Sequence, residues 1–175
     1  ARRLQTAATA MLPASITALP AALSKLPGVG PRSAERIALH LVQTDSAIVK
    51  QLAEVIVHAR EHIQFCTTCG ALTEQSPCPI CLDSRRDASL LCIVERAVDI
   101  FSVEKSGTFR GKFRVLGGKI SPLDGVEPDA LSIDALDIRL THELIKEIII
   151  ALGTDVEGDA TSHYLAKRIA RTGLE

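Results

Sequence analysis

The sequence predicts a mixed α/β protein whose N-terminal part is entirely helical. Apolar residues recur at helical spacing up to Gln64, two pairs of cysteines follow, and continuous apolar runs of strand length begin at Leu90. Because the periodicity changes twice along the chain, each change marks a boundary between structural units. We therefore expect a helical domain, a small metal-binding finger and an α/β domain with a mostly parallel sheet and flanking helices, at residues 1–64, 65–84 and 85–175.

The composition narrows the classes of protein that the chain can represent. Of its 175 residues 46% are hydrophobic, which is enough to bury a core, but only 3% are aromatic. Platforms of aromatic side chains that stack on bases are therefore not expected. The net charge of -1 gives no strong long-range attraction to nucleic acid, so DNA binding requires a local basic cluster. No apolar run approaches the roughly 20 residues of a membrane span, and no membrane partner is expected.

A short turn separates the first two predicted helices. It reads Leu26-Pro27-Gly28-Val29-Gly30-Pro31, and its glycines and prolines forbid continuation of the helix. Such a turn lets backbone N–H groups approach a phosphate, and the next helix presents the positive end of its dipole. Basic side chains that can add phosphate contacts lie beside the turn. The segment therefore predicts a DNA-contact hairpin that binds the DNA backbone without sequence preference. Its contact residues are Lys25, Gly28, Gly30, Arg32 and Arg36.

The hairpin pattern has two alternative interpretations. It also fits an ordinary helical hairpin whose arginines form a solvated face, or a hairpin that packs against a partner protein. Salt dependence distinguishes these alternatives from DNA binding. Phosphate binding weakens steeply as salt rises, whereas binding through an apolar interface does not.

Four cysteines form two Cys-x-x-Cys pairs, Cys66 with Cys69 and Cys78 with Cys81. Four thiolates can surround Zn²⁺ tetrahedrally, and this closed shell leaves no position for water or substrate. We therefore expect one structural Zn²⁺ per chain, held in a compact finger because the loop between the pairs is short. A disulfide pair and an iron–sulfur centre are the alternatives. The fifth cysteine, Cys92, lies in an apolar run and is expected to be a small buried hydrophobic residue.

The part of the chain after the cysteines has the pattern of an α/β sheet. Apolar runs of strand length occur at Leu90 to Val94, at Phe113 to Leu116 and at Glu147 to Leu152. The first and last runs are continuous, which is typical of parallel strands buried on both faces. An acidic turn and an amphipathic helix follow the last run, so strand, turn and helix recur in the order of an α/β fold.

Acidic residues follow two of these strands. They are Glu95, directly after the first strand, and Asp155, Glu157 and Asp159, just beyond the last. The carboxyl ends of parallel strands converge on one crevice, so these carboxylates are placed to hold Mg²⁺ for phosphodiester chemistry. Acidic residues at a helix start also cap the helix or stabilise its dipole. Whether Mg²⁺ binds is left open by the pattern.

Taken in order, five segments resemble the RecR recombination-mediator family across nearly the whole chain. They read LPGVGPRSAERIALHLV, CTTCGALTEQSPCPIC, RRDASLLCIVE, GKFRVLGGKISPLDGVEPDAL and DVEGDATSHYLAKRIA. The resemblance implies a helix-hairpin-helix domain, a four-Cys zinc finger and a Rossmann-like Toprim domain. It further implies dimers or tetramers that form a ring around DNA in the bacterial cytoplasm. The implied role, beside RecO and RecF, is to help RecA replace single-strand-binding protein on gapped DNA.

The resemblance can be carried over position by position. Arg32 and Arg36 match the family's basic DNA-contact residues, and the four finger cysteines match its zinc ligands. Glu95 and the acidic residues after the last strand fall on the Toprim acidic motifs. Two positions depart from the pattern: Gly153 stands where catalytic Toprim enzymes have the first Asp of a DxD motif, and Phe113-Arg114 stands where the family usually shows Tyr-His. The first departure agrees with a Toprim fold used for contacts rather than catalysis.

The two ends of the sequence also differ from the family pattern. RecR-like chains are expected to continue past the position of Glu175 with a further strand and a Gly-rich, acidic stretch that closes the ring. On this expectation the sequence is shortened at its C-terminus, and ring assembly is expected to be impaired. The first dozen residues match no pattern of the family.

Together these features predict a DNA-binding scaffold that is not an enzyme. One alternative is a Toprim nuclease or primase-like enzyme that uses Glu95 and Asp155 with Mg²⁺. A second alternative is a zinc-stabilised protein-interaction module. Because the net charge is nearly neutral, we expect a single subunit to bind DNA weakly, so that useful affinity requires several hairpins acting together.

Overall fold

A computed structural model of the chain describes residues 13–170. The expectations for the first dozen residues and for the C-terminal end fall on residues 1–12 and 171–175, outside the described part. The chain divides into two compact units, Ala1–Glu61 and His62–Glu175, and each is treated by itself below as unit 1 and unit 2. No helix in residues 13–170 is long and apolar enough to cross a membrane.

Unit 1 is helical, as the sequence predicts. It contains α2 (Ala14–Leu23), α3 (Pro31–Gln43) and nearly all of α4 (Ser46–His62). Helix α3 begins directly after the glycine–proline turn, with a proline at its first position, where the missing N–H costs no hydrogen bond. Its small residues Ala34 and Ala38 are buried, and α2 and α3 pack against each other. By contrast, α4 has no buried residue within the described structure.

The cysteine segment forms a compact finger at the start of unit 2. Two short antiparallel strands, β1 (Gln64–Phe65) and β2 (Leu72–Thr73), enclose the first cysteine pair. The second pair lies at the one-turn helix α5 (Pro79–Leu82). The expected compact finger is confirmed, because the strands are only two residues long and form no extended ribbon.

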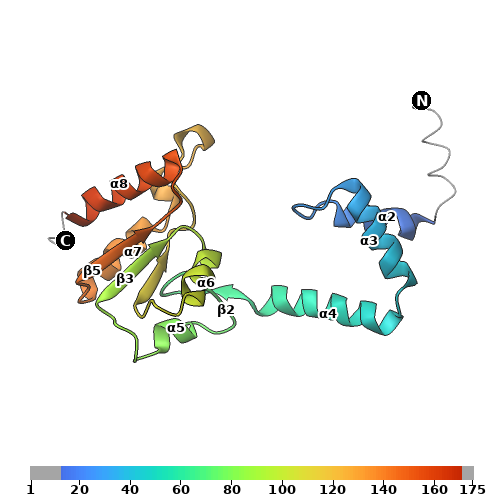
Figure 1. Cartoon of the computed structure of the whole chain (residues 1–175), viewed down its shortest axis with the longest axis horizontal. Coiled ribbons are helices and arrows are strands. Elements are labelled where there is room, and N and C mark those ends of the chain that lie inside the picture. Colours follow the sequence, from blue (N-terminus) through green and yellow to red (C-terminus); the bar gives the residue numbers. More distant parts are fainter. Residues whose placement is uncertain (1–12, 171–175) are drawn as a thin grey trace. The chain divides into compact units, whose positions relative to one another are not determined.

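The rest of unit 2 is a parallel sheet with the strand order β4-β3-β5 (Figure 1). Its strands are β3 (Leu90–Val94), β4 (Lys112–Val115) and β5 (Glu147–Ala151), close to the three predicted runs. Both neighbours run parallel to the central strand β3. The helices of this part are α6 (Ala97–Lys105), α7 (Ile133–His142) and α8 (Val156–Ala170), with short 3₁₀ turns at Pro122–Asp124 and Pro128–Ala130 before α7.

Two hydrophobic clusters cover the sheet. The first joins Cys92 and Phe113 to α6 and to the finger cysteines, so the finger shares a core with the sheet. The second joins Leu91 and Ile93 to α7 and α8. The expected burial on both faces holds for β3 but not for β5, whose residues are half-buried or exposed. Both β4 and β5 are edge strands in the described part of the chain, but β4 is buried because the finger packs against it.

Substitution of Gly158 by alanine is expected to destabilise the protein. A Cβ atom at Gly158, near the start of α8, would lie 1.8 Å from the carbonyl oxygen of Gly153, so the loop after β5 would have to shift. We expect a loss of about 2 kcal/mol of stability or more, measured by chemical denaturation of the zinc-loaded chain. Gly153→Ala is the matched control, because its new Cβ would meet no atom closer than 3.5 Å. Equal stability of the two variants would contradict this packing.

Candidate zinc centre, DNA-contact hairpin and acidic crevice

The four cysteines of the finger come together as one metal-binding cluster. The Sγ atoms of Cys66, Cys69, Cys78 and Cys81 all lie within 4.8 Å of one another. Zn–S bonds of about 2.3 Å place the sulfurs of a regular tetrahedron about 3.8 Å apart. The Cys69–Cys78 and Cys66–Cys81 separations of 3.5 and 3.9 Å fit that geometry. Both are far longer than a disulfide bond of about 2.05 Å, so the disulfide alternative does not fit. The cluster indicates a structural Zn²⁺.

Local backbone structure explains why the cysteines converge. Gly70 adopts a positive φ of 81°, which turns the chain back after the first pair and lets its amide donate to the carbonyl of Cys66 at 2.8 Å. The amide of Cys78 points at the Cys66 sulfur, 3.2 Å away. Hydrogen bonds from Cys81 and from the Ala71 amide lower the pKa of Cys69 to about 5, whereas burial raises the pKa of Cys78 and the hydrogen bond with Cys69 raises the pKa of Cys81. Burial also raises the pKa of Cys92 to about 11, and Cys92 lies outside the four-cysteine cluster.

Two cations of β4 anchor the finger to the sheet. The buried Lys112 ammonium donates to the carbonyls of Ile80, Cys81 and Asp83 at 2.9 to 3.0 Å, which ties the second knuckle to the strand. The Arg114 guanidinium donates to the Thr68 carbonyl at 3.0 Å, which ties the first knuckle to the same strand. The Phe113-Arg114 departure from the family pattern has no explanation in the sequence alone. The structure gives Arg114 a position between the finger and the sheet.

Arg114 is buried without a carboxylate partner. Its side chain is 7% exposed, its Nε has no hydrogen-bond partner, and none of the ion pairs among residues 13–170 includes it. Burial and the nearby Arg139 lower its pKa. Thiolates of Cys69 and Cys66 act in the opposite direction, and a zinc ion with four thiolates carries two negative charges in excess. The attraction to these thiolates therefore offsets only part of the cost of burying the guanidinium.

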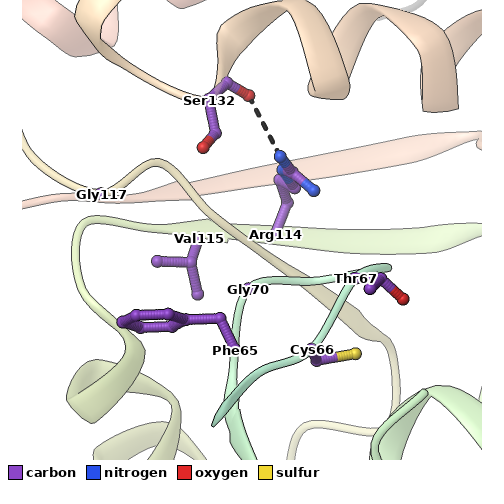
Figure 2. Close-up of a pocket in the computed structure, with 8 residues that line it drawn as sticks. All are labelled: Phe65, Cys66, Thr67, Gly70, Arg114, Val115, Gly117 and Ser132. Carbon is purple, nitrogen blue, oxygen red and sulfur yellow. Dashed lines mark hydrogen bonds between the residues drawn. The ribbon is translucent and has the colours of Figure 1, made fainter. Parts of the chain in front are cut away.

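A pocket of about 370 Å³ lies beside Arg114, between the finger and the sheet (Figure 2). The ring of Phe65 lies beside Val115, while the guanidinium of Arg114 points to the carbonyl of Ser132. Gly70 lines the same pocket, and a Cβ there would lie 2.9 Å from the Cβ of Val115. The finger therefore fits against β4 so closely that only glycine is accommodated at this position.

The DNA-contact hairpin has the backbone geometry that the sequence predicts. Gly28 has a positive φ of 79°, and Gly30 precedes the first turn of α3 without a side-chain cap. In residues 13–170 no acceptor is found for the amides of Gly28, Gly30, Arg32 and Ser33. Lys25, Arg32 and Arg36 are exposed, so the turn presents free N–H groups with cations beside them. That arrangement suits an anion such as a phosphate.

The acidic residues after the strands divide into two kinds. Glu95 follows β3, and Asp155 lies between β5 and α8, so these two carboxylates meet where the parallel strands end. Glu157 and Asp159 instead lie in the first turn of α8, where they stabilise the helix dipole. Asp155 also caps this helix, since its Oδ1 accepts a hydrogen bond from the amide of Gly158 at 2.8 Å. Asp155 therefore makes the capping contact that was one of the two interpretations of the acidic pattern.

A lysine that sequence reasoning missed lies between the two carboxylates. Lys119, in the loop after β4, donates a hydrogen bond to Asp155 Oδ2, and its Nζ is 3.8 Å from Glu95 Oε2. These contacts raise the pKa of Lys119, and the hydrogen bond from Lys119 lowers the pKa of Asp155. Lys119 lies within the GGKISP segment, where its spacing from the acidic residues gives no signal. Only the convergence of three strand ends brings the groups together.

Comparison with known proteins finds a matching domain family for each of the three segments of the chain. Residues 16–60 match the helix-hairpin-helix domain of RecR, residues 63–83 match the four-cysteine zinc finger domain of RecR, and residues 89–175 match the Toprim domain. Among curated proteins, the Recombination protein RecR of Leifsonia xyli is 48% identical over 83% of this chain and 73% of that protein. The Recombination protein RecR of Streptomyces coelicolor is 44% identical over 87% and 77% of the two chains. That of Desulfatibacillum aliphaticivorans is 43% identical over 93% and 82%.

The fold and the sites define a zinc-finger protein that combines a helix-hairpin-helix domain with a Toprim domain. The extent and identity of these matches make the assignment specific. The chain belongs to the RecR family of recombination proteins. The iron–sulfur alternative for the four cysteines is set aside, because the finger matches a zinc-finger domain over its whole length.

Replacing Arg114 by methionine is expected to weaken the zinc centre. The thiolates would lose a buried cation, and the Thr68 carbonyl would lose its donor. Groups around metal ligands typically contribute 10- to 100-fold in metal affinity. Because Arg114 bonds the Thr68 carbonyl between two ligands rather than a ligand itself, we expect the low end of this range, with zinc release to a colorimetric chelator about tenfold faster. Arg110→Met, at an exposed arginine, is the control and should release zinc at the native rate. Native zinc release from Arg114→Met would show that the guanidinium does not stabilise the cluster.

Proposed function

We propose that this chain is a DNA-binding scaffold of recombinational DNA repair. In this role it clamps gapped DNA and helps RecO and RecF to load the RecA recombinase, without a catalytic activity of its own. Membership of the RecR family supports the repair role. The observation that carries DNA binding is the hairpin, where the backbone amides of Gly28 and Gly30 have no acceptor among residues 13–170 and lie beside exposed cations. The proposed contact residues are Lys25, Gly28, Gly30, Arg32 and Arg36.

In this proposed role the three segments of the chain have different tasks. Residues 1–64 bind DNA, residues 65–84 hold one structural Zn²⁺ through Cys66, Cys69, Cys78 and Cys81, and residues 85–175 serve as a contact surface. The acidic residues of the last segment then meet a partner protein rather than a nucleotide. Family membership and the free-amide hairpin both favour a place in the bacterial cytoplasm, where DNA is available.

We further propose that the protein acts as a homodimer or as a tetrameric ring. Support comes from α4, where five large apolar residues are 45 to 61% exposed within the described structure. Several of them recur at i, i+4, i+7 and i+8, as on one face of a helix that packs against a partner. They are Ile48, Leu52, Val55 and Ile56. A second copy of the chain is the proposed partner, because a ring joins several hairpins on one DNA molecule.

Charge reversal at the hairpin tests the DNA contact. We expect the Arg32→Glu/Arg36→Glu variant to bind labelled gapped DNA about tenfold or more weaker than the native chain, with a shallower salt dependence, in a fluorescence-anisotropy titration. Lys50→Glu/Arg60→Glu reverses the same number of charges on α4 and should change affinity far less. Salt-sensitive binding that survives reversal at the hairpin would place the DNA contact elsewhere. Binding that does not depend on salt would favour the protein-interaction alternative.

Charged residues on the apolar face of α4 test the oligomer. We expect Leu52→Glu/Ile56→Glu to lower the mass measured by analytical ultracentrifugation and to weaken DNA binding with it, since separate hairpins lose their joint attachment. Gln51→Glu adds one charge to the same helix and should leave both measurements unchanged. An unchanged mass in the double variant would remove α4 from the proposed interface.

A further inference from the structure

The crevice at the carboxyl ends of the three parallel strands contains a cation from the chain itself. Glu95 follows β3, Lys119 follows β4, and Asp155 follows β5. The ammonium group of Lys119 lies between the two carboxylates, bonded to Asp155 and 3.8 Å from Glu95 Oε2. This is the place where a divalent metal ion would have to bind in order to use both carboxylates.

The loop that carries Lys119 is held in position by α8. The amide of the next residue, Ile120, donates to Thr161 Oγ1 at 2.9 Å, and Thr161 is completely buried. The Thr161 hydroxyl in turn donates to the carbonyl of Glu157 at 2.6 Å. The lysine therefore extends from an anchored backbone, and its side chain is itself only 20% exposed.

The other groups of the crevice are also poorly arranged for a metal ion. Both oxygens of Asp155 are already engaged, Oδ1 by the Gly158 amide and Oδ2 by Lys119. Glu95 has a second cation nearby, with Arg96 Nε 4.0 Å from its Oε1. Gly153 lies between the two carboxylates, where an ideal Cβ would be 3.5 Å from Asp155 Oδ2 and 3.7 Å from Glu95 Oε2, but it has no side chain to offer as a ligand.

We propose that Lys119 is the resident cation of this crevice and that the Toprim domain of this chain consequently takes no divalent metal ion there. A metal ion would have to displace the Lys119 ammonium from Asp155. It would then remain beside a second positive charge, that of Arg96. Mg²⁺ gains little from such a site, because it requires near-octahedral oxygen ligands and gives up its water reluctantly. Lys119 thus offsets the carboxylates and joins the loop after β4 to the start of α8.

The test is Mn²⁺ binding to the zinc-loaded chain. Binding is measured through the electron paramagnetic resonance signal of free Mn²⁺. We expect the native chain to show no binding at low-millimolar Mn²⁺ at moderate salt. Removal of the ammonium in Lys119→Met leaves Glu95 and Asp155 uncompensated, and this variant should bind one Mn²⁺ in the low-millimolar range. The added substitution Glu95→Gln should abolish that gain.

Two controls separate a cation effect from a folding defect. Lys119→Arg keeps a positive charge and should remain unable to bind Mn²⁺, while Lys167→Met removes an exposed lysine of α8 and should behave as the native chain does. Native-like far-ultraviolet circular dichroism and zinc content are required of each variant. Should Lys119→Met unfold, Lys119→Gln takes its place and carries the same expectation.

These Mn²⁺ measurements test the role of Lys119 in the crevice independently of DNA binding. Mn²⁺ binding to the native chain that is lost in Glu95→Gln would overturn it, and so would a folded Lys119→Met that binds no Mn²⁺. Native DNA binding by Lys119→Met is compatible with either result, because the DNA-contact hairpin lies in unit 1. Failure of this inference therefore leaves the proposed function standing, and failure of the DNA contact leaves this inference standing.

Discussion

The attachment of the four-cysteine finger to β4 is the constraint on which unit 2 depends. It combines the hydrogen bond from the Val115 amide to the Cys69 carbonyl, at 2.8 Å, with the donors of Lys112 and Arg114. These buried cations could not stay in an apolar core without acceptors, because an isolated buried charge is very costly. The finger supplies carbonyl oxygens and thiolates for them. The metal cluster and the edge of the sheet therefore stabilise each other.

Opposite charges also offset each other at the carboxyl ends of the strands. In the finger, anionic sulfurs are offset by cations from the sheet. In the crevice, Glu95 and Asp155 are offset by Lys119. Each cluster of like charges is thus matched by side chains of the chain itself, apart from the one Zn²⁺ that four thiolates indicate.

The sequence was sufficient to predict whatever depends on local pattern. Apolar runs located the three strands to within one or two residues, glycines and prolines located the hairpin, and cysteine spacing located the metal cluster. It was insufficient for contacts made by segments far apart. Lys112, Arg114 and Lys119 are ordinary basic residues in the sequence, and their partners lie 18 to 46 positions away. The exposure of β5 was missed for a related reason, since an apolar run does not reveal whether distant segments cover an edge strand, as the finger covers β4.

The charge distribution bears on how such a scaffold can hold DNA. With a net charge of -1, the chain has no general attraction to phosphates, and much of its basic charge in unit 2 is committed to partners within the fold. Arg86, Arg139 and Arg168 all pair with carboxylates there. Under the proposed function, the exposed hairpin cations Lys25, Arg32 and Arg36 carry most of the phosphate contact. A few contacts per subunit give weak and salt-sensitive binding. Firm attachment then depends on joining several hairpins, for which α4 offers an apolar face.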